Sequence, residues 1–334
     1  MNKWLLGLLV IGGGFALLVI LGVSLVGLGI YNRRNNPDAQ FNRLNIRGNQ
    51  YFSSHQYRAA EADYTAMIAL RPNRSEGYVM RGEVECQLKN FGQGIEDAEA
   101  GMRFAASPAD RAGCYQQRGD CYRGMRQWHR AVADYNEAVK RGDEDFELYI
   151  GRATCYEELK QYKRAASDFA TLVYSDPARA EFSWHYARNL VNSGNIVGAV
   201  DVYKTMTKRF PGDPDIWNTL CWHQYLANDL TAAIRSAKKA LALNENTLYA
   251  GFNLALCYAV QGKAESARLE YIKACRGAPA AEIAAALGEI VTALKKRPGF
   301  APLQAMQTLL QSRLAKTAKA KIIRRPAPET EATQ

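Results

Sequence analysis

AGCYQQRGDCYRGMRQWHRAVADYNEAVKRGDED, residues 112–145, is one unit of a pattern that recurs along the chain. Counted from Ala112, the unit has small residues at positions 8 and 20 and aromatic residues at positions 11, 17 and 24. At steps of 34 residues, with one step of 37, the pattern starts again at Phe41, Ser75, Phe146, Ala180, Pro214 and Leu248. The chain therefore contains an internal repeat, and this repeat decides the fold.

Each repeat predicts two antiparallel helices. Apolar residues at positions 4, 8 and 11, and then at 17, 20, 24 and 27, recur at helical spacing, so each helix has one apolar stripe. Small residues at positions 8 and 20 allow the two backbones to approach closely. Because one helix pair cannot bury its apolar face alone, neighbouring pairs must stack.

This pattern resembles the tetratricopeptide repeat (TPR) family, whose 34-residue unit is matched by Gly48, Tyr51, Ala60, Tyr64 and Pro72. The resemblance implies an all-α, right-handed solenoid that binds proteins in its inner groove. We expect about seven helix-turn-helix repeats within residues 41–281, namely 41–74, 75–111, 112–145, 146–179, 180–213, 214–247 and 248–281. Two further apolar stripes predict a capping helix pair at 282–315.

The two ends of the chain differ from the repeats. Residues 4–31 contain no charged side chain, which predicts a transmembrane helix within segment 1–31, with a cleaved signal peptide as the alternative. A linker at 32–40 follows, and its arginines place the repeats in the cytoplasm by the positive-inside rule, with the opposite orientation as the alternative. The sequence thus predicts a single-pass membrane protein. The basic tail, 316–334, is predicted to be disordered, either contacting anionic lipid or simply solvated.

Charge, cysteine and histidine usage exclude several classes of function. The net charge is +10, but the excess is concentrated outside the repeats, so no nucleic-acid partner is expected. The seven cysteines are an odd number, and three of them share position 10, which favours small apolar filling in a reducing compartment over disulfides. The four histidines lack metal-site spacing, and no nucleophile, acid/base pair or P-loop is evident. We expect no catalytic residue, no metal and no cofactor, hence no enzyme.

Positions 7 and 23 carry paired charges in the first four repeats. Position 7 is arginine and position 23 is aspartate in all four, and the later repeats lose this combination. Since guanidinium and carboxylate groups match in geometry, the pattern predicts an ion pair between the two helices of each repeat. The predicted pairs are Arg47 with Asp63, Arg81 with Asp97, Arg118 with Asp134, and Arg152 with Asp168. A ladder of arginines for a phosphate ligand is the alternative.

The TPR resemblance implies that first-helix positions 2, 5, 9, 12 and 13 line the groove. Repeats two to four are acidic there, with Arg123 as a basic exception; the acids are Glu76, Glu83, Asp120, Glu147, Glu157 and Glu158. Repeats five to seven are mainly aromatic there, and include Trp184, Arg188, Trp222, Tyr225, Tyr249 and Phe252. Exposed aromatic residues favour a protein-binding site, whereas packing of Tyr249 and Phe252 under the capping helices is the alternative.

These features together predict a membrane-anchored scaffold that binds a partner segment in the groove and recruits it to the membrane. The acidic and aromatic stretches favour a partner with basic and apolar residues. Two other functions stay open: a structural or assembly subunit of a membrane protein complex, and a chaperone-like receptor for unfolded clients.

Overall fold

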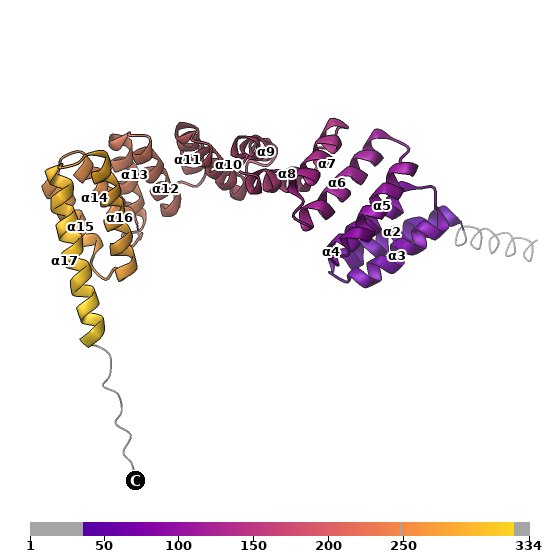
Figure 1. Ribbon diagram of the computed structural model, residues 1–334, viewed down its shortest axis with the longest axis horizontal. Coiled ribbons are helices and arrows are strands. Elements are labelled where there is room, and N and C mark those ends of the chain that lie inside the picture. The colour runs from indigo at the N-terminus through magenta and orange to yellow at the C-terminus, as the bar shows by residue number, and fades with distance from the viewer. Residues whose placement is uncertain (1–35, 248, 324–334) are drawn as a thin grey trace, which may run out of the picture. The chain divides into compact units, whose positions relative to one another are not determined.

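A computed structural model describes residues 36–247 and 249–323 of the chain. In this part of the chain all regular structure is helical: sixteen α-helices, α2 to α17, and no strand (Figure 1). The described residues form two compact units, with the boundary between Lys160 and Gln161. The boundary falls within the fourth predicted repeat, so α8 belongs to the first unit and α9 to the second.

The first unit is built from helical hairpins. In three of its repeats the two helices pack against each other, and each hairpin packs against the next. The first helices of adjacent repeats, α4, α6 and α8, are also in contact. The helices are α2 (Pro37–Ser53), α3 (Tyr57–Leu70), α4 (Ser75–Gln87), α5 (Phe91–Phe104), α6 (Pro108–Gly124), α7 (Trp128–Lys140) and α8 (Phe146–Glu158).

The second unit continues the same plan. Its hairpins are α10 with α11, α12 with α13, α14 with α15, and α16 with α17, and α9 packs against α10. The helices are α9 (Tyr162–Ser175), α10 (Ala180–Asn192), α11 (Ile196–Arg209), α12 (Pro214–Leu226), α13 (Leu230–Leu243), α14 (Ala250–Val260), α15 (Ala264–Ala274), α16 (Ala280–Lys296) and α17 (Ala301–Ile323).

The small residues at positions 8 and 20 are buried in all seven repeats. In the first repeat, a Cβ atom at Gly48 would lie 2.5 Å from Cε1 of Tyr64, and in the third a Cβ at Gly119 would lie 3.0 Å from Cε1 of Tyr135. The aromatic residue at position 24 therefore occupies the space that the small residue leaves. This packing explains why the sequence pattern pairs a small residue with an aromatic one.

The turn between the two helices of each repeat has a residue with positive φ. It is always position 15, where φ lies between 56° and 85°. The seven residues are His55, Lys89, Arg126, Lys160, Gly194, Asn228 and Gly262. A single left-handed residue ends the first helix and reverses the chain, as at many helix C-termini.

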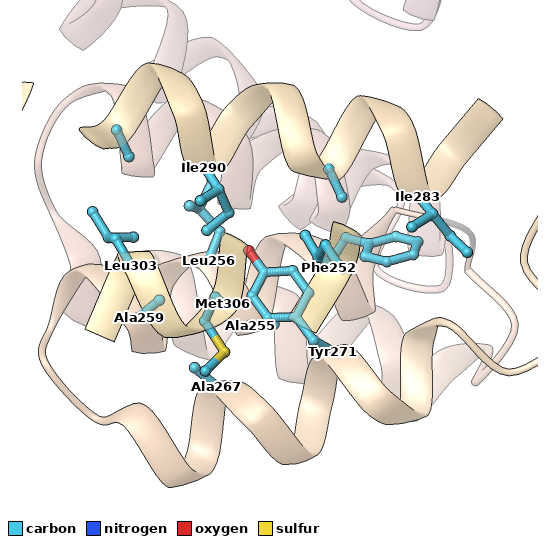
Figure 2. Packing of buried hydrophobic residues seen from close by; sticks show 13 residues of the cluster. Phe252, Ala255, Leu256, Ala259, Ala267, Tyr271, Ile283, Ile290, Leu303 and Met306 are labelled. Carbon is cyan, nitrogen blue, oxygen red and sulfur yellow. The ribbon is translucent and has the colours of Figure 1, made fainter. Parts of the chain in front are cut away.

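The C-terminal helices α16 and α17 cover an apolar core shared with α14 and α15. Figure 2 shows Phe252 and Tyr271 among Ile283, Ile290 and Met306, and the two aromatic rings lie 6.3 Å apart between centroids. Helix α17 continues to Ile323, so the tail predicted from residue 316 starts as a helix. Its alanine and lysine residues are strong helix formers, which accounts for the extension.

The prediction of a single-pass membrane protein with cytoplasmic repeats is contradicted. None of the helices among the described residues combines the length and the apolar character that a membrane span requires. The longest of them, α17, has 23 residues but carries several lysines and an arginine. The predicted span at 4–31 lies outside the described residues.

The prediction that the cysteines form no disulfide is wrong for two of them. Cys86 of α4 and Cys121 of α6 form a disulfide, with Cα atoms 5.3 Å apart. All seven cysteines lie within the described residues, and the other five are free thiols. The two partners occupy different repeat positions, 12 and 10, and only the stacking of adjacent first helices brings them together.

Candidate functional site

Three of the four predicted arginine and aspartate pairs have bidentate geometry in the structure. Nε and Nη2 of Arg47 donate to the two carboxylate oxygens of Asp63 at 2.7 and 2.5 Å. The same geometry joins Arg81 to Asp97 at 2.9 and 2.7 Å, and the third pair, Arg118 with Asp134, at 2.8 and 2.9 Å. Each pair links the first helix of a repeat to its second helix, and each aspartate is buried.

The fourth predicted pair stays a prediction. Arg152 lies in the first unit and Asp168 in the second. Within its own unit, Arg152 donates from Nη1 to Oδ1 of Asn136 at 3.0 Å. Its guanidinium also lies over the ring of Tyr149, 5.3 Å from the centroid.

The first candidate binding site is a cavity of about 480 Å³ in the first unit, between α4, α6 and α8. Three consecutive first helices contribute to it, together with Phe91 and Trp128 at the starts of α5 and α7. We call it the acidic pocket, and its lining includes Glu83, Gln117, Asp120, Arg123, Trp128 and Glu147.

One acid in this pocket is held by a local hydrogen-bond triangle. Oδ1 of Asp120 accepts from the Tyr135 hydroxyl at 2.7 Å and from Nη2 of Arg123 at 3.0 Å. Nε of Arg123 in turn donates to the Tyr135 hydroxyl at 3.1 Å. Burial raises the pKa of Asp120 against the opposing effect of Arg123. The arginine is thus already engaged and neutralises only one of the pocket's acids.

The other acids lack such a partner. Glu83 and Glu147 form no ion pair with the described residues. The Glu83 side chain is exposed but lies in a concave region, where limited solvation, together with Asp120 and Asp145, raises its pKa to about 7. Two other predicted groove acids, Glu157 and Glu158, lie at the end of α8 and do not line the acidic pocket.

A second cavity, of about 410 Å³, lies in the second unit around Trp184. The Trp184 and Tyr203 rings are 5.4 Å apart, and Tyr203 is 4.7 Å from the ring of His223. The exposed Arg188 places Nη2 3.0 Å from Nδ1 of His185. Nδ1 of His223 lies 2.8 Å from the Thr219 carbonyl oxygen, and burial lowers the pKa of this histidine. The pocket therefore presents a neutral imidazole among aromatic rings.

The third cavity, of about 310 Å³, lies between α12, α14 and α16 of the second unit. We call it the aromatic pocket, and its lining includes Asn218, Trp222, Tyr249, Phe252, Asn253 and Glu289. Tyr249 is 47% exposed and Trp222 is half-buried. Nδ2 of Asn253 donates to Oδ1 of Asn218 at 2.9 Å, so the wall also has a polar side.

Two predicted binding residues have mainly structural positions. Phe252 is only 4% exposed and belongs to the core under α16 (Figure 2), although it also contributes to the lining of the aromatic pocket. Tyr225 packs against the same core and against Trp222, with ring centroids 5.3 Å apart. The alternative that the last repeat packs under the capping helices therefore applies to Phe252 but not to the exposed Tyr249.

Sequence reasoning missed several residues of these pockets. Asn218 and Asn253 sit at positions 5 and 6 of adjacent repeats, and their pairing depends on the stacking of α12 and α14. Gln117 is 4% exposed, and its Oε1 has no hydrogen-bond partner among the described residues. The described residues contain no group of three or more metal-ligating side chains placed to hold a metal ion.

Comparison with known proteins agrees with this architecture. The family model for the tetratricopeptide repeat matches residues 117–180 and 222–282. These two stretches are tetratricopeptide repeats. TPR arrays are protein-interaction scaffolds that are generally not enzymes. No curated protein matches the sequence.

Two solved structures with TM-scores above 0.5 share the fold at low sequence identity, and a third is similar at a lower score. The C-terminal part of a TPR repeat-containing protein from Cytophaga hutchinsonii is 14% identical, with a TM-score of 0.52, and the match covers 69% of this chain and 93% of that chain. The structure of Naa15/Naa10 bound to HypK-THB is 14% identical, with a TM-score of 0.56, covering 86% of this chain and 47% of that chain. YrrB, a TPR protein with an unusual peptide-binding site, is 17% identical, with a TM-score of 0.46, over 56% of this chain and 95% of its own.

Proposed function

We propose that this TPR protein is a scaffold that binds a segment of a partner protein, and that the aromatic pocket holds an apolar side chain of that segment. The observation that supports this proposal best is that one cavity contains both accessible and buried aromatic residues. Trp222 and Tyr249 are accessible, whereas Phe252 is anchored in the core below them. A binding surface that is already rigid loses little conformational entropy when a partner binds.

The amide pair in the pocket wall supports the same function. Asn253 uses one amide hydrogen for its bond to Asn218. The side-chain Nδ2 of Asn218 and Oδ1 of Asn253 form no hydrogen bond with the described residues, so the pocket wall keeps one donor and one acceptor for a ligand. A peptide backbone offers the complementary pair of groups.

The proposal is tested by photo-crosslinking in cells. A photoreactive phenylalanine analogue at the exposed Tyr249 should crosslink a defined partner, and Trp222→Ala should abolish that product because the pocket loses its largest ring. Trp217→Ala is the matched control: Trp217 lies on the same helix, outside the pocket, where its Nε1 donates to the Pro211 carbonyl at 3.0 Å. It should retain the product.

Two other results would contradict the proposal. If Trp222→Ala captured the same partners as the unaltered chain, the pocket would have no role and a permanent structural subunit would be the better description. If many unrelated proteins were captured weakly, a receptor for unfolded clients would be favoured instead.

A further inference from the structure

The cavity around Trp184, which we call the Trp184 cavity, contains two polar groups that the protein itself leaves without a partner. Tyr203 is only 4% exposed and His223 only 9% exposed. Neither the Tyr203 hydroxyl nor Nε2 of His223 forms a hydrogen bond with any described residue. The described residues that line the cavity are Trp184, His185, Arg188, Val191, Tyr203 and His223, all from α10, α11 and α12.

Both of these polar atoms remain accessible to a ligand. Neither belongs to the completely enclosed side-chain atoms that have no hydrogen-bond partner in the described chain. Since Tyr203 and His223 are otherwise buried and both line the Trp184 cavity, their accessible polar atoms lie at this cavity. Polar groups that are almost buried are normally satisfied, so this pair points to a ligand.

A neighbouring carbonyl fixes the hydrogen-bonding role of the histidine. Nδ1 of His223 lies 2.8 Å from the Thr219 carbonyl oxygen, and because a carbonyl oxygen can only accept, Nδ1 carries the proton. Burial lowers the pKa of His223, so the imidazole is neutral at pH 7 and Nε2 is an acceptor. Burial raises the pKa of Tyr203 to about 12, so its hydroxyl keeps its proton and can donate.

These roles select an uncharged ligand. A carboxylate has no hydrogen to donate to Nε2 of His223 and would direct its own lone pairs toward that atom. None of the described residues that line the Trp184 cavity is acidic, so an ammonium or guanidinium group would find no counter-charge there. The ligand group therefore has to be neutral and to both donate and accept, as a hydroxyl or a carboxamide does.

The aromatic walls of the cavity select between these two groups. The Trp184 and Tyr203 ring centroids are 5.4 Å apart, and those of Tyr203 and His223 are 4.7 Å apart. Tyr203 belongs to a buried core, which holds this wall in place. Aromatic ligands pack well against such rings, and the volume of about 410 Å³ admits a side chain of that size. Only a phenol combines an aromatic ring with a hydroxyl that donates and accepts, since an indole only donates.

We propose that the Trp184 cavity binds a tyrosine side chain of a protein partner. The ligand hydroxyl donates to Nε2 of His223 and accepts from the Tyr203 hydroxyl, and the ligand ring packs against Trp184. This inference rests on the proposed function of the chain as a protein-binding scaffold, but it concerns a site separate from the aromatic pocket.

The test is an NMR titration of the full chain with N-acetyl-tyrosine amide, followed at the indole N–H of Trp184. The variant Trp184→Phe assigns this signal among the five tryptophans. The signal should shift saturably, with an affinity at least about tenfold higher than for N-acetyl-phenylalanine amide, which lacks only the hydroxyl. Equal affinities, or no saturable shift, would overturn the proposal. Tighter binding of N-acetyl-asparagine amide would do so too, because the site would then recognise a carboxamide.

The variant Tyr203→Phe removes the donor without breaking a hydrogen bond within the described chain, so the fold should tolerate it. It should weaken binding of the tyrosine amide about tenfold and leave binding of the phenylalanine amide unchanged. Tyr271→Phe is the matched control, since Tyr271 is 1% exposed and lies in the core under α16, outside the Trp184 cavity (Figure 2). Equal weakening by both variants would contradict a site at Tyr203.

The acceptor role of His223 is tested with N-acetyl-O-methyltyrosine amide, whose oxygen cannot donate. The unaltered chain should bind this compound about tenfold more weakly than the tyrosine amide. His223→Phe keeps a ring but removes the acceptor, so most of this difference should disappear. If the whole difference persisted in the variant, it would reflect the bulk of the methyl group, and the assigned role of His223 would be wrong.

A failure here is distinguishable from a failure of the proposed function. The titrations need no partner protein, so an absence of tyrosine binding contradicts only this inference. Unchanged crosslinking by Trp222→Ala contradicts the proposed function at the aromatic pocket and does not alter the result of the titrations.

Discussion

At the residue scale, one backbone angle constrains seven positions that share no side-chain chemistry. Position 15 of each repeat has positive φ and is occupied by histidine, lysine, arginine, asparagine or glycine. A left-handed conformation costs an L-residue about 1–2 kcal/mol, and glycine avoids that cost. The turn geometry is therefore set by the two helices it joins, and the residue adapts to it.

This argument predicts that Gly194→Ala lowers the free energy of unfolding by about 1 kcal/mol, because φ at Gly194 is +85°. Gly288→Ala in the same unit is the control. Gly288 lies on the exposed face of α16, and a Cβ there meets no atom within 4 Å, so alanine should stabilise the helix by about 0.5–1 kcal/mol. Thermal denaturation of both variants checks the opposite signs, and equal shifts would refute the argument.

At the scale of the element, ion pairs connect the two helices of a repeat. In the second repeat, the side chain of Arg81 is 21% exposed and that of Asp97 is 3% exposed. Taking charges out of water is costly, so the value of the pair depends on its bidentate geometry. Removing one partner leaves the other charge partly buried and uncompensated.

We expect Asp97→Ala to lower the free energy of unfolding by about 2–3 kcal/mol, below the full cost for a buried charge because Arg81 retains some contact with water. The control is Asp201→Ala on α11, where the exposed pair with Lys204 at 3.1 Å should contribute less than about 1 kcal/mol. Chemical denaturation compares the two variants. Similar small effects would mean that the bidentate pairs do not stabilise the repeats.

The capping helices show how an element decides the role of a residue in its neighbour. Position 5 of the seventh repeat, Phe252, faces a core that α16 and α17 complete. Position 5 of the fifth repeat, Trp184, instead borders a cavity. The same repeat position is therefore structural in one place and accessible in another, depending on what covers it.

At the scale of the whole molecule, a covalent bond joins adjacent repeats. The disulfide between Cys86 and Cys121 spans 35 positions of the sequence and closes a loop through α5. In the chain-entropy account, closing a loop of that length stabilises the folded state by about 4 kcal/mol, because the unfolded chain has fewer conformations. The disulfide thus restricts the conformations of the unfolded chain, and in the folded chain it ties α4 to α6 beside the acidic pocket.

The structure predicts five reactive thiols in the denatured, unreduced protein and seven after reduction. Thiol titration under denaturing conditions measures this directly. Reduction should also lower the melting temperature, whereas a chain with both Cys86→Ser and Cys121→Ser should melt at the same temperature with and without reductant. Seven reactive thiols before reduction would contradict the disulfide.

The sequence by itself determined the helical hairpin and its repeat, because the small and aromatic residues that pack within one hairpin lie at set distances along the chain. Gly48 with Tyr64 and Gly119 with Tyr135 are contacts of this kind, 16 residues apart. The arginine and aspartate residues at positions 7 and 23 could be matched for the same reason. The repeat positions expected to line the groove also identified Glu83, Asp120, Trp184 and Trp222 as candidate binding residues, and all four line cavities.

Only the tertiary structure decided what meets between repeats. The disulfide, the Asn218 and Asn253 pair and the unpartnered Oε1 of Gln117 depend on the offset between stacked first helices. Sequence periodicity fixes which face a residue lies on, but the offset arises from side-chain packing across the interface, and here one repeat step differs in length from the others. The burial of Phe252 likewise follows from the helices that pack over it, because solvent exposure depends on neighbours that are distant in the chain.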